Sequence, residues 1–293
     1  MANMTSSVSA SQVAGELASA TFEEIPALVE HYREDPRQQV IKACERALKR
    51  HAKELAERER VNDMYELMHE LGGDGVVVGV DEVGRGSVAG PLTVCAVCLP
   101  MEPRVWGIND SKKLTPARRE LLSVKIAEVA TAIGFCHIAP KDIDEMGMAR
   151  AIRAAVAGAV ADTGLEPDCV LMDGNPLGAV PNERDVVKGD GKIACIAAAS
   201  IMAKVTRDEM MVEYDAEYPE YHLAESKGYA SPEHIEAIRK HGLCPLHRVS
   251  FFGNFLQTER LFKVNCGDRD LRGFINLLVA GRMQQHCCVR PVF

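Results

Sequence analysis

An apolar run that ends in two adjacent acids constrains the fold of this chain more than any other feature. Residues 76–80 read VVVGV, which is typical of a buried strand, and Asp81 and Glu82 follow directly. Burying an unpaired charge is costly, so two carboxylates at the end of a core strand need compensation. In an open α/β sheet, the carboxyl ends of the strands face the crevice where ligands bind. The run therefore predicts an α/β fold with a polar site at this strand end.

Two further apolar runs end in the same way. In the stretch DCVLMDGN, the apolar run is followed directly by Asp173. In DVVKGDGK, Asp190 lies between two glycines. A single acidic pair is more often a surface feature, here Glu82 with Arg85, but three such strand ends indicate a shared site. Gathered carboxylates repel one another, and the usual resolution is a hard divalent cation such as Mg²⁺. This pattern suits phosphodiester hydrolysis with two ions about 4 Å apart.

Composition places the chain among ordinary globular proteins. It has 293 residues, of which 47% are hydrophobic and 26% charged. No apolar run reaches the length of about 18 residues that a membrane helix needs, and the N-terminus lacks a secretory signal, so we expect a cytoplasmic location. The net charge of −8 argues mildly against nucleic acid, but positive residues cluster at 112–113, 118–119 and 239–248.

Strand-like and helix-like patterns alternate along the middle of the chain. Strands are predicted at 76–80, 92–99, 133–138, 169–172 and 185–188, and helices at 115–130, 142–162 and 194–217. The first two strands are separated by a few residues, which favours an antiparallel pair. The later strands alternate with helices, which favours parallel pairing. The expected fold is a mixed sheet flanked by helices.

The remaining segments have their own character. We expect a disordered tail over 1–20, a helical N-terminal extension over 21–72, a core domain over 73–257, and a small C-terminal helical region of unknown role over 258–293. Asp35 is a candidate N-cap with Pro36 at the first helical position, and Gly72-Gly73 ends the extension. The extension is either a helical appendage packed on the core or an accessory nucleic-acid-binding element. Its acidic residues are interleaved with its basic residues, which favours the packed appendage.

Two other motifs admit more than one interpretation. The G-x-G spacing at 84–86 is followed by a strand pattern and not by a helix, which excludes a dinucleotide fingerprint. It is either an ordinary tight turn or a turn that brings backbone groups close to a sugar or phosphate. His241, Cys244 and His247 offer at most three zinc ligands at poor spacing, so a loop is favoured.

Seven motifs, taken in order, resemble bacterial ribonuclease HII. They read GVDEVGRGSVAGP, NDSKKLTPARRELL, VLMDGN, VVKGDGK, AAASIMAKVTRDEMM, KGYASPEHIEAIRKHG and HRVSF. The match covers about residues 75–252, and the preceding helical segment resembles the N-terminal extension that some members carry. The resemblance implies a ribonuclease H-like fold and makes 73–257 the catalytic domain.

The resemblance also implies a reaction. It is endonucleolytic cleavage, dependent on Mg²⁺ or Mn²⁺, of RNA paired with DNA, leaving 5′-phosphate and 3′-hydroxyl ends. Members also incise at a single ribonucleotide embedded in duplex DNA. The implied partners are the RNA–DNA hybrid duplex and ribonucleotide-containing DNA, acted on by a monomer that does not bind membranes.

The acidic positions of the family fall on the acids already singled out. They are Asp81, Glu82, Asp173 and Asp190, which the resemblance makes both catalytic residues and ligands of two metal ions. Asp81 and Asp173 would share the ions, and the other two would complete the two shells. Asp208 is a rival for the fourth position, but it lies within a predicted helix near Lys and Arg, where an ion pair is expected.

The family's substrate-binding positions also have counterparts. Gly84, Arg85 and Gly86 match the turn that senses the 2′-hydroxyl beside the scissile phosphate, and Tyr229 matches the tyrosine that stacks on the deoxyribose across the RNA–DNA junction. Such contacts distinguish RNA from DNA. A phosphate-contacting segment matches Ser111, Lys112 and Lys113.

Two positions depart from the family pattern. Ser226 stands where His usually precedes Lys-Gly-Tyr, and Ser87 stands where Pro usually follows Gly-Arg-Gly. Both departures leave the carboxylates intact. The alternatives are a nuclease of the same fold with another substrate, such as a DNA junction, and an inactive nucleic-acid-binding homologue.

Overall fold

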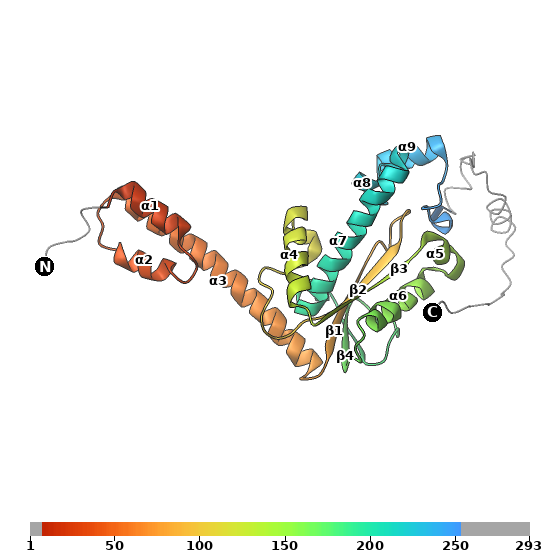
Figure 1. Ribbon diagram of the computed structural model, residues 1–293, viewed down its shortest axis with the longest axis horizontal. Coiled ribbons are helices and arrows are strands. Elements are labelled where there is room, and N and C mark those ends of the chain that lie inside the picture. Colours follow the sequence, from red (N-terminus) through yellow and green to blue (C-terminus); the bar gives the residue numbers. More distant parts are fainter. Residues whose placement is uncertain (1–7, 253–293) are drawn as a thin grey trace. The chain divides into compact units, whose positions relative to one another are not determined.

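A mixed sheet forms the centre of the protein. The computed structural model describes residues 8–252, and among these the sheet has five strands in the order β3-β2-β1-β4-β5 (Figure 1). They are β1 (Val77–Val83), β2 (Leu92–Cys98), β3 (Ala132–Ile138), β4 (Cys169–Asp173) and β5 (Glu183–Val186). The predicted α/β sheet is thus confirmed, and β1 is its central strand, with β2 on one side and β4 on the other.

The pairing of the strands was predicted only in part. β1 pairs antiparallel with β2, and both β4 and β5 join the sheet in parallel, as expected. The expectation of parallel pairing for the third strand is wrong, because β3 runs antiparallel to β2. An intervening helix permits either direction, and the local pattern does not choose between them.

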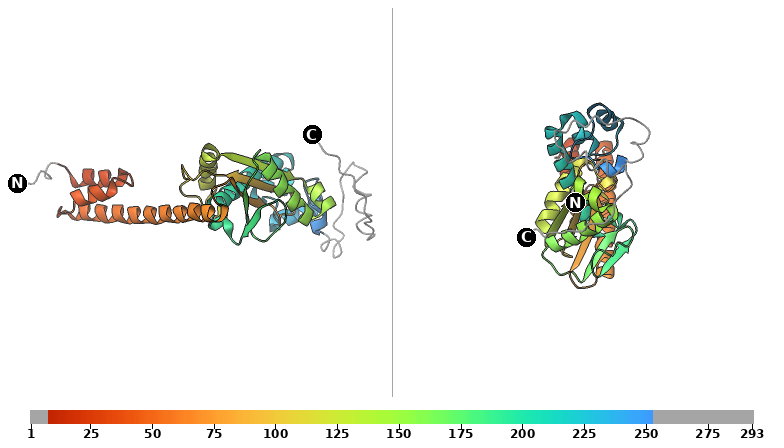
Figure 2. Two further views of the ribbon diagram at one scale, coloured as in Figure 1. Left: turned by 90° about the horizontal axis from the view of Figure 1, so that it is seen from below. Right: turned by 90° about the vertical axis from the view of Figure 1, so that its right-hand side faces the viewer.

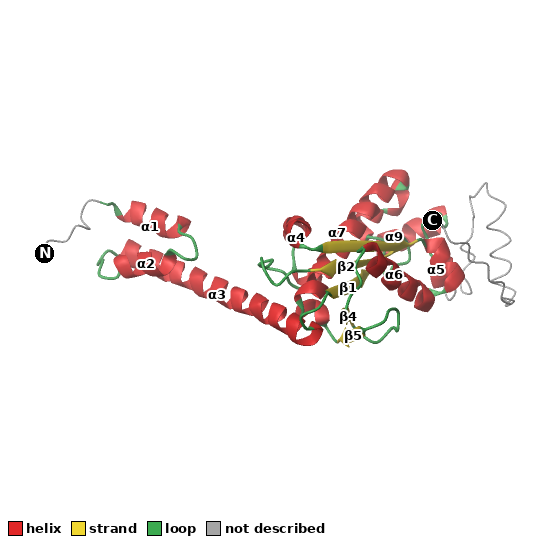
Figure 3. Cartoon of the chain, turned by 60° about the horizontal axis from the view of Figure 1, so that its bottom comes forward, coloured by secondary structure: helices red, strands yellow, loops and turns green. Residues whose placement is uncertain are grey.

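Helices cover both faces of the sheet (Figure 3). They are α4 (Pro116–Val129), α6 (Met148–Asp162) and α7 (Ala194–Glu217). A Cβ on Gly79 of β1 would collide with the backbone of Cys195, so the start of α7 lies directly on the strand. A Cβ on Gly134 of β3 would collide with the Ala159 carbonyl of α6. Because Gly79 and Gly134 point to opposite faces through the registers of β1, β2 and β3, α7 and α6 lie on opposite sides.

The helix predicted over 142–162 is two helices. α5 (Pro140–Met146) ends before Gly147, which has a φ of 80°, and α6 begins after it. A left-handed residue interrupts the helical hydrogen bonds, and glycine adopts that conformation without strain. Hydrophobic periodicity continues across the break, so it did not reveal the break.

The N-terminal extension is helical, as expected, and begins earlier than predicted. α1 (Ala10–Ser19) and α2 (Ile25–His31) pack on the first half of α3 (Gln38–Gly72), which is one continuous helix (Figure 2). The expected disordered tail over 1–20 is therefore wrong for α1. Its start is fixed by a capping box, in which Ser9 and Gln12 exchange hydrogen bonds.

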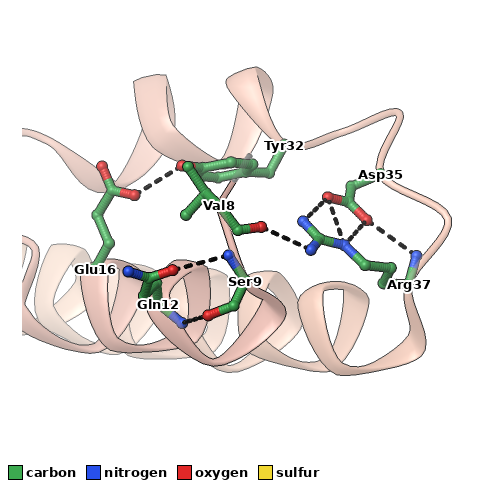
Figure 4. A network of polar contacts seen from close by, with 7 residues as sticks. All are labelled: Val8, Ser9, Gln12, Glu16, Tyr32, Asp35 and Arg37. Atoms are coloured by element: carbon green, nitrogen blue, oxygen red, sulfur yellow. Dashed lines mark hydrogen bonds and ion pairs between the residues drawn. The ribbon is translucent and has the colours of Figure 1, made fainter. Parts of the chain in front are cut away.

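The predicted cap of the long helix is also wrong. The helix begins at Gln38 with Arg37 as N-cap, and Asp35 lies before the cap, where its Oδ1 accepts the Arg37 backbone N–H at 3.0 Å. Its carboxylate also accepts hydrogen bonds from the Arg37 guanidinium at 2.6 and 2.9 Å (Figure 4). This pairing lowers the pKa of Asp35 to about 2. Gly73, with a φ of 78°, ends the helix as expected.

The second half of α3 contributes to the core of the sheet domain. Met64, Tyr65 and Met68 are buried in the same cluster as Val77 and Leu171. The Val105 N–H donates to the Tyr65 hydroxyl at 2.9 Å, which satisfies this buried polar group. The extension therefore shares a hydrophobic core with the sheet.

Residues 8–252 divide into two compact units. The first contains the extension, the sheet and α6, over 8–85, 92–138 and 146–207, and the second contains 86–91, 139–145 and 208–252. The second unit includes α8 (Leu223–Ser226) and α9 (Pro232–His241), with Ser231 as N-cap. The C-terminal helical region predicted over 258–293 lies outside the described residues. Within 8–252, no helix is both long and apolar enough to cross a membrane.

We predict that Gly79→Ala lowers the free energy of unfolding by about 1–3 kcal/mol, because the new methyl group meets backbone atoms that cannot rotate away. Chemical denaturation with urea measures the change. Gly15 in α1 is the control, since a Cβ there meets nothing within 4 Å and Gly→Ala in a helix stabilises by roughly 0.5–1 kcal/mol. Equal effects of the two substitutions would contradict this account of the contact between α7 and β1.

Candidate active site

The acids predicted from the strand ends lie at the ends of neighbouring strands. Val80 of β1 pairs with Met172 of β4 in parallel register, so the next residues along each strand, Asp81 and Asp173, lie at the same edge of the sheet. Asp190 follows β5 in a short 3-10 helix, Gly189–Gly191. The Gly189 N–H donates to Asp173 Oδ1 at 2.7 Å, which holds this turn against β4. Three segments distant in sequence therefore meet here.

Asp81 is the most strongly perturbed acid of the site. Its side chain is buried, with 8% of the residue exposed, and its pKa is raised to about 8. Burial is the main cause, and the like charges of Glu82 and Asp173 add to it. Hydrogen bonds from Ser200 and from the Glu82 N–H, the latter at 2.8 Å, oppose the shift. The carboxyl group is held in place by these two hydrogen bonds, and the net result of burial and like charges is still a raised pKa.

The other two shifted acids have partial compensation. Burial raises the pKa of Glu82, while Arg85 lowers it through an ion pair of 3.4 Å between Nη1 and Oε1. Burial and the charge of Asp173 raise the pKa of Asp190, and Lys112 opposes this with its Nζ 3.5 Å from Oδ2. Asp173 contributes to the shift of every other acid, so the four carboxylates form one electrostatic group.

This group fits a hard divalent cation in its chemistry. All four donors are carboxylates, which suit Mg²⁺ and Mn²⁺ and not soft metals. The raised pKa values reflect burial first and repulsion between the carboxylates second, and a bound cation would offset both. As the side chains stand, no three His, Cys, Asp or Glu residues within 8–252 are arranged as a preassembled metal site. The fit therefore rests on the donor chemistry and the burial of Asp81.

The predicted phosphate-contacting segment lies beside these acids. Ser111–Lys113 forms a 3-10 helix, which Asp110 caps by accepting the Lys112 N–H at 2.9 Å. The side chains of Lys112 and Lys113 are largely exposed. Ser111, in contrast, is buried, and its hydroxyl lies 2.9 Å from the Ser200 hydroxyl. The two lysines are therefore presented to solvent, while the Ser111 side chain faces inward.

Ser200 is a site residue that the sequence analysis missed. It lies on α7 within a run of buried alanines and is itself buried. Since Ser200 donates to Asp81, its oxygen accepts the proton of Ser111, and a chain of hydroxyls supports this buried carboxylate. A lone polar residue on a buried apolar helix face was the available indication, because such a group needs a hydrogen-bond partner.

The predicted recognition residues divide between the two units. Gly84, with a φ of 84°, and Arg85 belong to the first unit, and Gly86 begins the second. A Cβ on Gly86 would meet nothing within 4 Å, so the turn is open at this point. Tyr229 is 42% exposed.

The segment that follows Gly86 is tied to the segment that carries Tyr229. The N–H groups of Val88 and Ala89 donate to the Gly228 carbonyl at 2.9 and 3.0 Å. The structure therefore brings two of the predicted recognition segments together within the second unit.

The zinc alternative does not fit the geometry. Nδ1 of His247 accepts the Cys244 N–H at 2.9 Å, and Nε2 lies 3.1 Å from Nε2 of His234. Both ring nitrogens are used in hydrogen bonds, so the loop interpretation holds.

Comparison with known proteins finds relatives for both parts of the chain. The family model "Ribonuclease HII" matches residues 78–253, and "Ribonuclease HII N-terminal domain" matches 9–71. The ribonuclease HII of Ruminiclostridium cellulolyticum is 44% identical over 204 residues, which are 69% of this chain and 80% of that protein.

Solved structures show the same fold. The ribonuclease H2 from Pyrococcus horikoshii OT3 is 28% identical with a TM-score of 0.52, covering 59% of this chain and 92% of that one. Bst-RNase HIII in complex with Mn²⁺ is 19% identical with a TM-score of 0.51, covering 62% of this chain and 68% of that one.

The strand order, the flanking helices and the structural relatives together define a hydrolytic nuclease of the ribonuclease H-like fold. The chain belongs to the ribonuclease HII family, and its activity is that of a ribonuclease H.

We predict that Ser200→Ala lowers kcat/KM on an RNA–DNA hybrid about 10- to 100-fold, the usual cost of losing a group that supports a buried acid. Loss of the donated hydrogen bond removes an interaction that favours the charged form of Asp81. Ser123→Ala is the control, because the Ser123 hydroxyl donates only to the Glu120 carbonyl of its own helix. Similar activities for the two variants would contradict the assigned role of Ser200.

Proposed function

We propose that this chain hydrolyses the RNA strand of RNA–DNA hybrids and incises duplex DNA at single embedded ribonucleotides, leaving 5′-phosphate and 3′-hydroxyl ends. The observation that carries the proposal is the electrostatic group of Asp81, Glu82, Asp173 and Asp190 around the ends of β1 and β4. A buried carboxyl group whose pKa is raised to about 8 by burial and like charges is typical of a functional site. It is poorly explained as a structural ion pair, since the main charge effects on its pKa come from two other acids, Glu82 and Asp173.

The four acids are the proposed ligands of two divalent ions, Mg²⁺ or Mn²⁺. When bound, such ions supply charge neutralisation at the phosphate and an activated water. Bst-RNase HIII, which has the same fold, was solved with Mn²⁺. In this chain Asp173 is fixed by the Gly189 N–H and Asp81 by Ser200, so both are oriented before any ligand arrives.

The chain's own cations are proposed to place the substrate. Lys112 and Lys113 lie beside Asp190 with exposed ammonium groups, which suits contact with backbone phosphates. Contacts of this kind fix the register of a duplex without reading its bases. They also offset the repulsion between a polyanionic substrate and a cluster of acids.

Recognition of RNA is proposed to come from the Gly84–Arg85–Gly86 turn and from Tyr229. The open space at Gly86 allows close approach of a sugar to the backbone, where the 2′-hydroxyl is the group that distinguishes RNA from DNA. An exposed aromatic ring at Tyr229 suits stacking against a deoxyribose. We further propose that the enzyme acts as a cytoplasmic monomer.

The two departures from the family pattern are both accommodated within the fold. The Ser226 hydroxyl accepts the Gly228 N–H at 3.2 Å, and the Ser226 carbonyl accepts the Tyr229 N–H at 2.9 Å. Ser87 is fully buried. Both serines are therefore part of an ordered local structure, and the four carboxylates are retained. This favours an active enzyme over an inactive binding homologue.

We predict that Asp173→Asn lowers cleavage of a duplex with one ribonucleotide by more than about 100-fold while the protein remains folded. The amide oxygen still accepts the Gly189 N–H, so the turn after β5 is retained, but the negative charge is lost. Single-turnover cleavage with Mg²⁺ or Mn²⁺, with circular dichroism as the folding check, measures both effects.

Three substrates distinguish the proposal from its alternatives. The wild-type protein is expected to cut the one-ribonucleotide duplex and the continuous hybrid, and to leave the all-DNA duplex and a four-way DNA junction intact. Preferred cleavage of the junction would establish the same-fold alternative. Binding without metal-dependent turnover on every substrate would establish the inactive homologue.

A further inference from the structure

A hydrogen-bonded pair of buried histidines lies in the second unit. His234, on α9, has no exposed surface, and His247 is 3% exposed. Their Nε2 atoms are 3.1 Å apart. Tyr221 packs against the pair, with its ring centroid 4.9 Å from that of His247 in an edge-on arrangement. Because buried polar groups are normally hydrogen-bonded, each ring nitrogen of the two imidazoles needs a partner.

The partners of the outer nitrogens determine the tautomers of both rings. Nδ1 of His234 lies 2.9 Å from the Tyr229 carbonyl, which only accepts, so His234 carries its proton on Nδ1 and donates. Its Nε2 is then an acceptor, and His247 must donate to it from Nε2. This leaves Nδ1 of His247 unprotonated, so it accepts the Cys244 N–H at 2.9 Å and can also accept from the Cys244 thiol at 3.2 Å. The Cys244 carbonyl, at the longer distance of 3.3 Å from the same nitrogen, then receives no hydrogen bond from it. One neutral tautomer of each ring satisfies all three hydrogen bonds.

The surroundings of the pair favour these neutral forms. Burial lowers the pKa of both rings, that of His247 to about 3. The charge of His222 acts in the same direction on His234. The relay from Cys244 through both rings to Tyr229 is therefore intact at neutral pH.

The same residues connect the two recognition segments of the second unit. His247 forms an isolated antiparallel bridge with Ala89. The buried guanidinium of Arg248 donates to the Gly90 carbonyl from Nε and Nη2 at 3.1 and 2.8 Å. At the other end of the relay, the Tyr229 carbonyl accepts from His234 and from the Ser231 N–H at 2.8 Å. The Tyr229 backbone is thus connected to the Gly86–Pro91 segment through His234 and His247.

We propose that His234 and His247 are positioning residues that hold Tyr229 in a fixed relation to the Gly86–Pro91 segment and so determine how tightly the RNA–DNA junction is bound. The inference rests on the proposed function, because it takes Tyr229 and the Gly86 turn as the junction-recognition elements. Neither histidine touches the substrate in this account. Their effect passes through the Tyr229 backbone, so it falls on substrate binding and not on the chemical step.

A matched pair of substitutions tests the donor to Tyr229. Asn and Leu have similar shapes, but only His234→Asn places an N–H near the position of Nδ1. We expect His234→Leu to raise KM for a one-ribonucleotide duplex by about 3- to 10-fold with kcat changed less than twofold, and His234→Asn to retain most of the wild-type KM. Equal KM values for both variants, or a loss confined to kcat, would overturn the proposal.

A double-mutant cycle tests the route through Tyr229. If His234 acts through Tyr229, then His234→Leu should have little further effect on KM in a Tyr229→Ala background. Independent effects that multiply would show that the histidine acts elsewhere and would overturn the assignment. If the wild-type enzyme itself does not cut the one-ribonucleotide duplex, the proposed function fails instead, and the two failures are therefore distinguishable.

A measurement on the wild-type protein keeps the proposal testable should the Leu variant fail to fold. Nitrogen-15 NMR of the histidine rings at pH 7 is expected to show His234 protonated on Nδ1 alone and His247 on Nε2 alone. The opposite tautomers, or a doubly protonated ring in either residue, would break the relay and overturn the proposal.

Discussion

The direct contact of α7 with β1 at Gly79 is the constraint on which the active site depends. Without a side chain at Gly79, the backbone of Cys195 lies against the strand, and the helix is held at the closest distance that backbone atoms allow. Two residues further along β1, Asp81 points to the same face. One and a half turns further along α7, Ser200 comes within reach of it. The close contact therefore both buries the carboxyl group and supplies its hydrogen bond.

Burial sets the electrostatics of this site more than any single ion pair does. It is the largest cause of the raised pKa of Asp81, Glu82 and Asp190 alike. The cations near the cluster are peripheral, because Arg85 reaches Glu82 and Lys112 reaches Asp190, and both side chains are largely exposed. A site built in this way keeps buried carboxylates whose charged forms are disfavoured. A ligand of opposite charge would favour those charged forms. Such a site favours a small, multiply charged cation that coordinates several oxygen atoms.

The sequence predicted those parts of the candidate site that depend on local pattern. Asp81 and Asp173 were predicted because each follows a short apolar run typical of a strand, and the structure places both at one edge of the sheet. The direction of β3 and the break at Gly147 were not, because both depend on how distant segments pack. The same holds for Asp35, whose carboxylate is taken by Arg37 and not by the helix N-terminus. Ser200 required knowledge of which face of α7 meets β1, which no spacing in the sequence reveals.

The proposed catalytic residues and the proposed recognition residues are held by different kinds of interaction in this protein. The carboxylates are placed by sheet register and by one helix, which are rigid because many backbone hydrogen bonds fix them. The Gly86–Pro91 segment and Tyr229 are not held by a continuous series of sheet hydrogen bonds. They depend on individual hydrogen bonds with Gly228, Arg248 and the histidine pair. The Arg248 bonds are buried and the bond from His234 to Tyr229 is partly buried, and a buried hydrogen bond is costly to leave unmade. A short loop can therefore be held as firmly as a strand in a sheet when each polar group around it has a hydrogen-bond partner. In the histidine pair, one combination of neutral tautomers makes these hydrogen bonds.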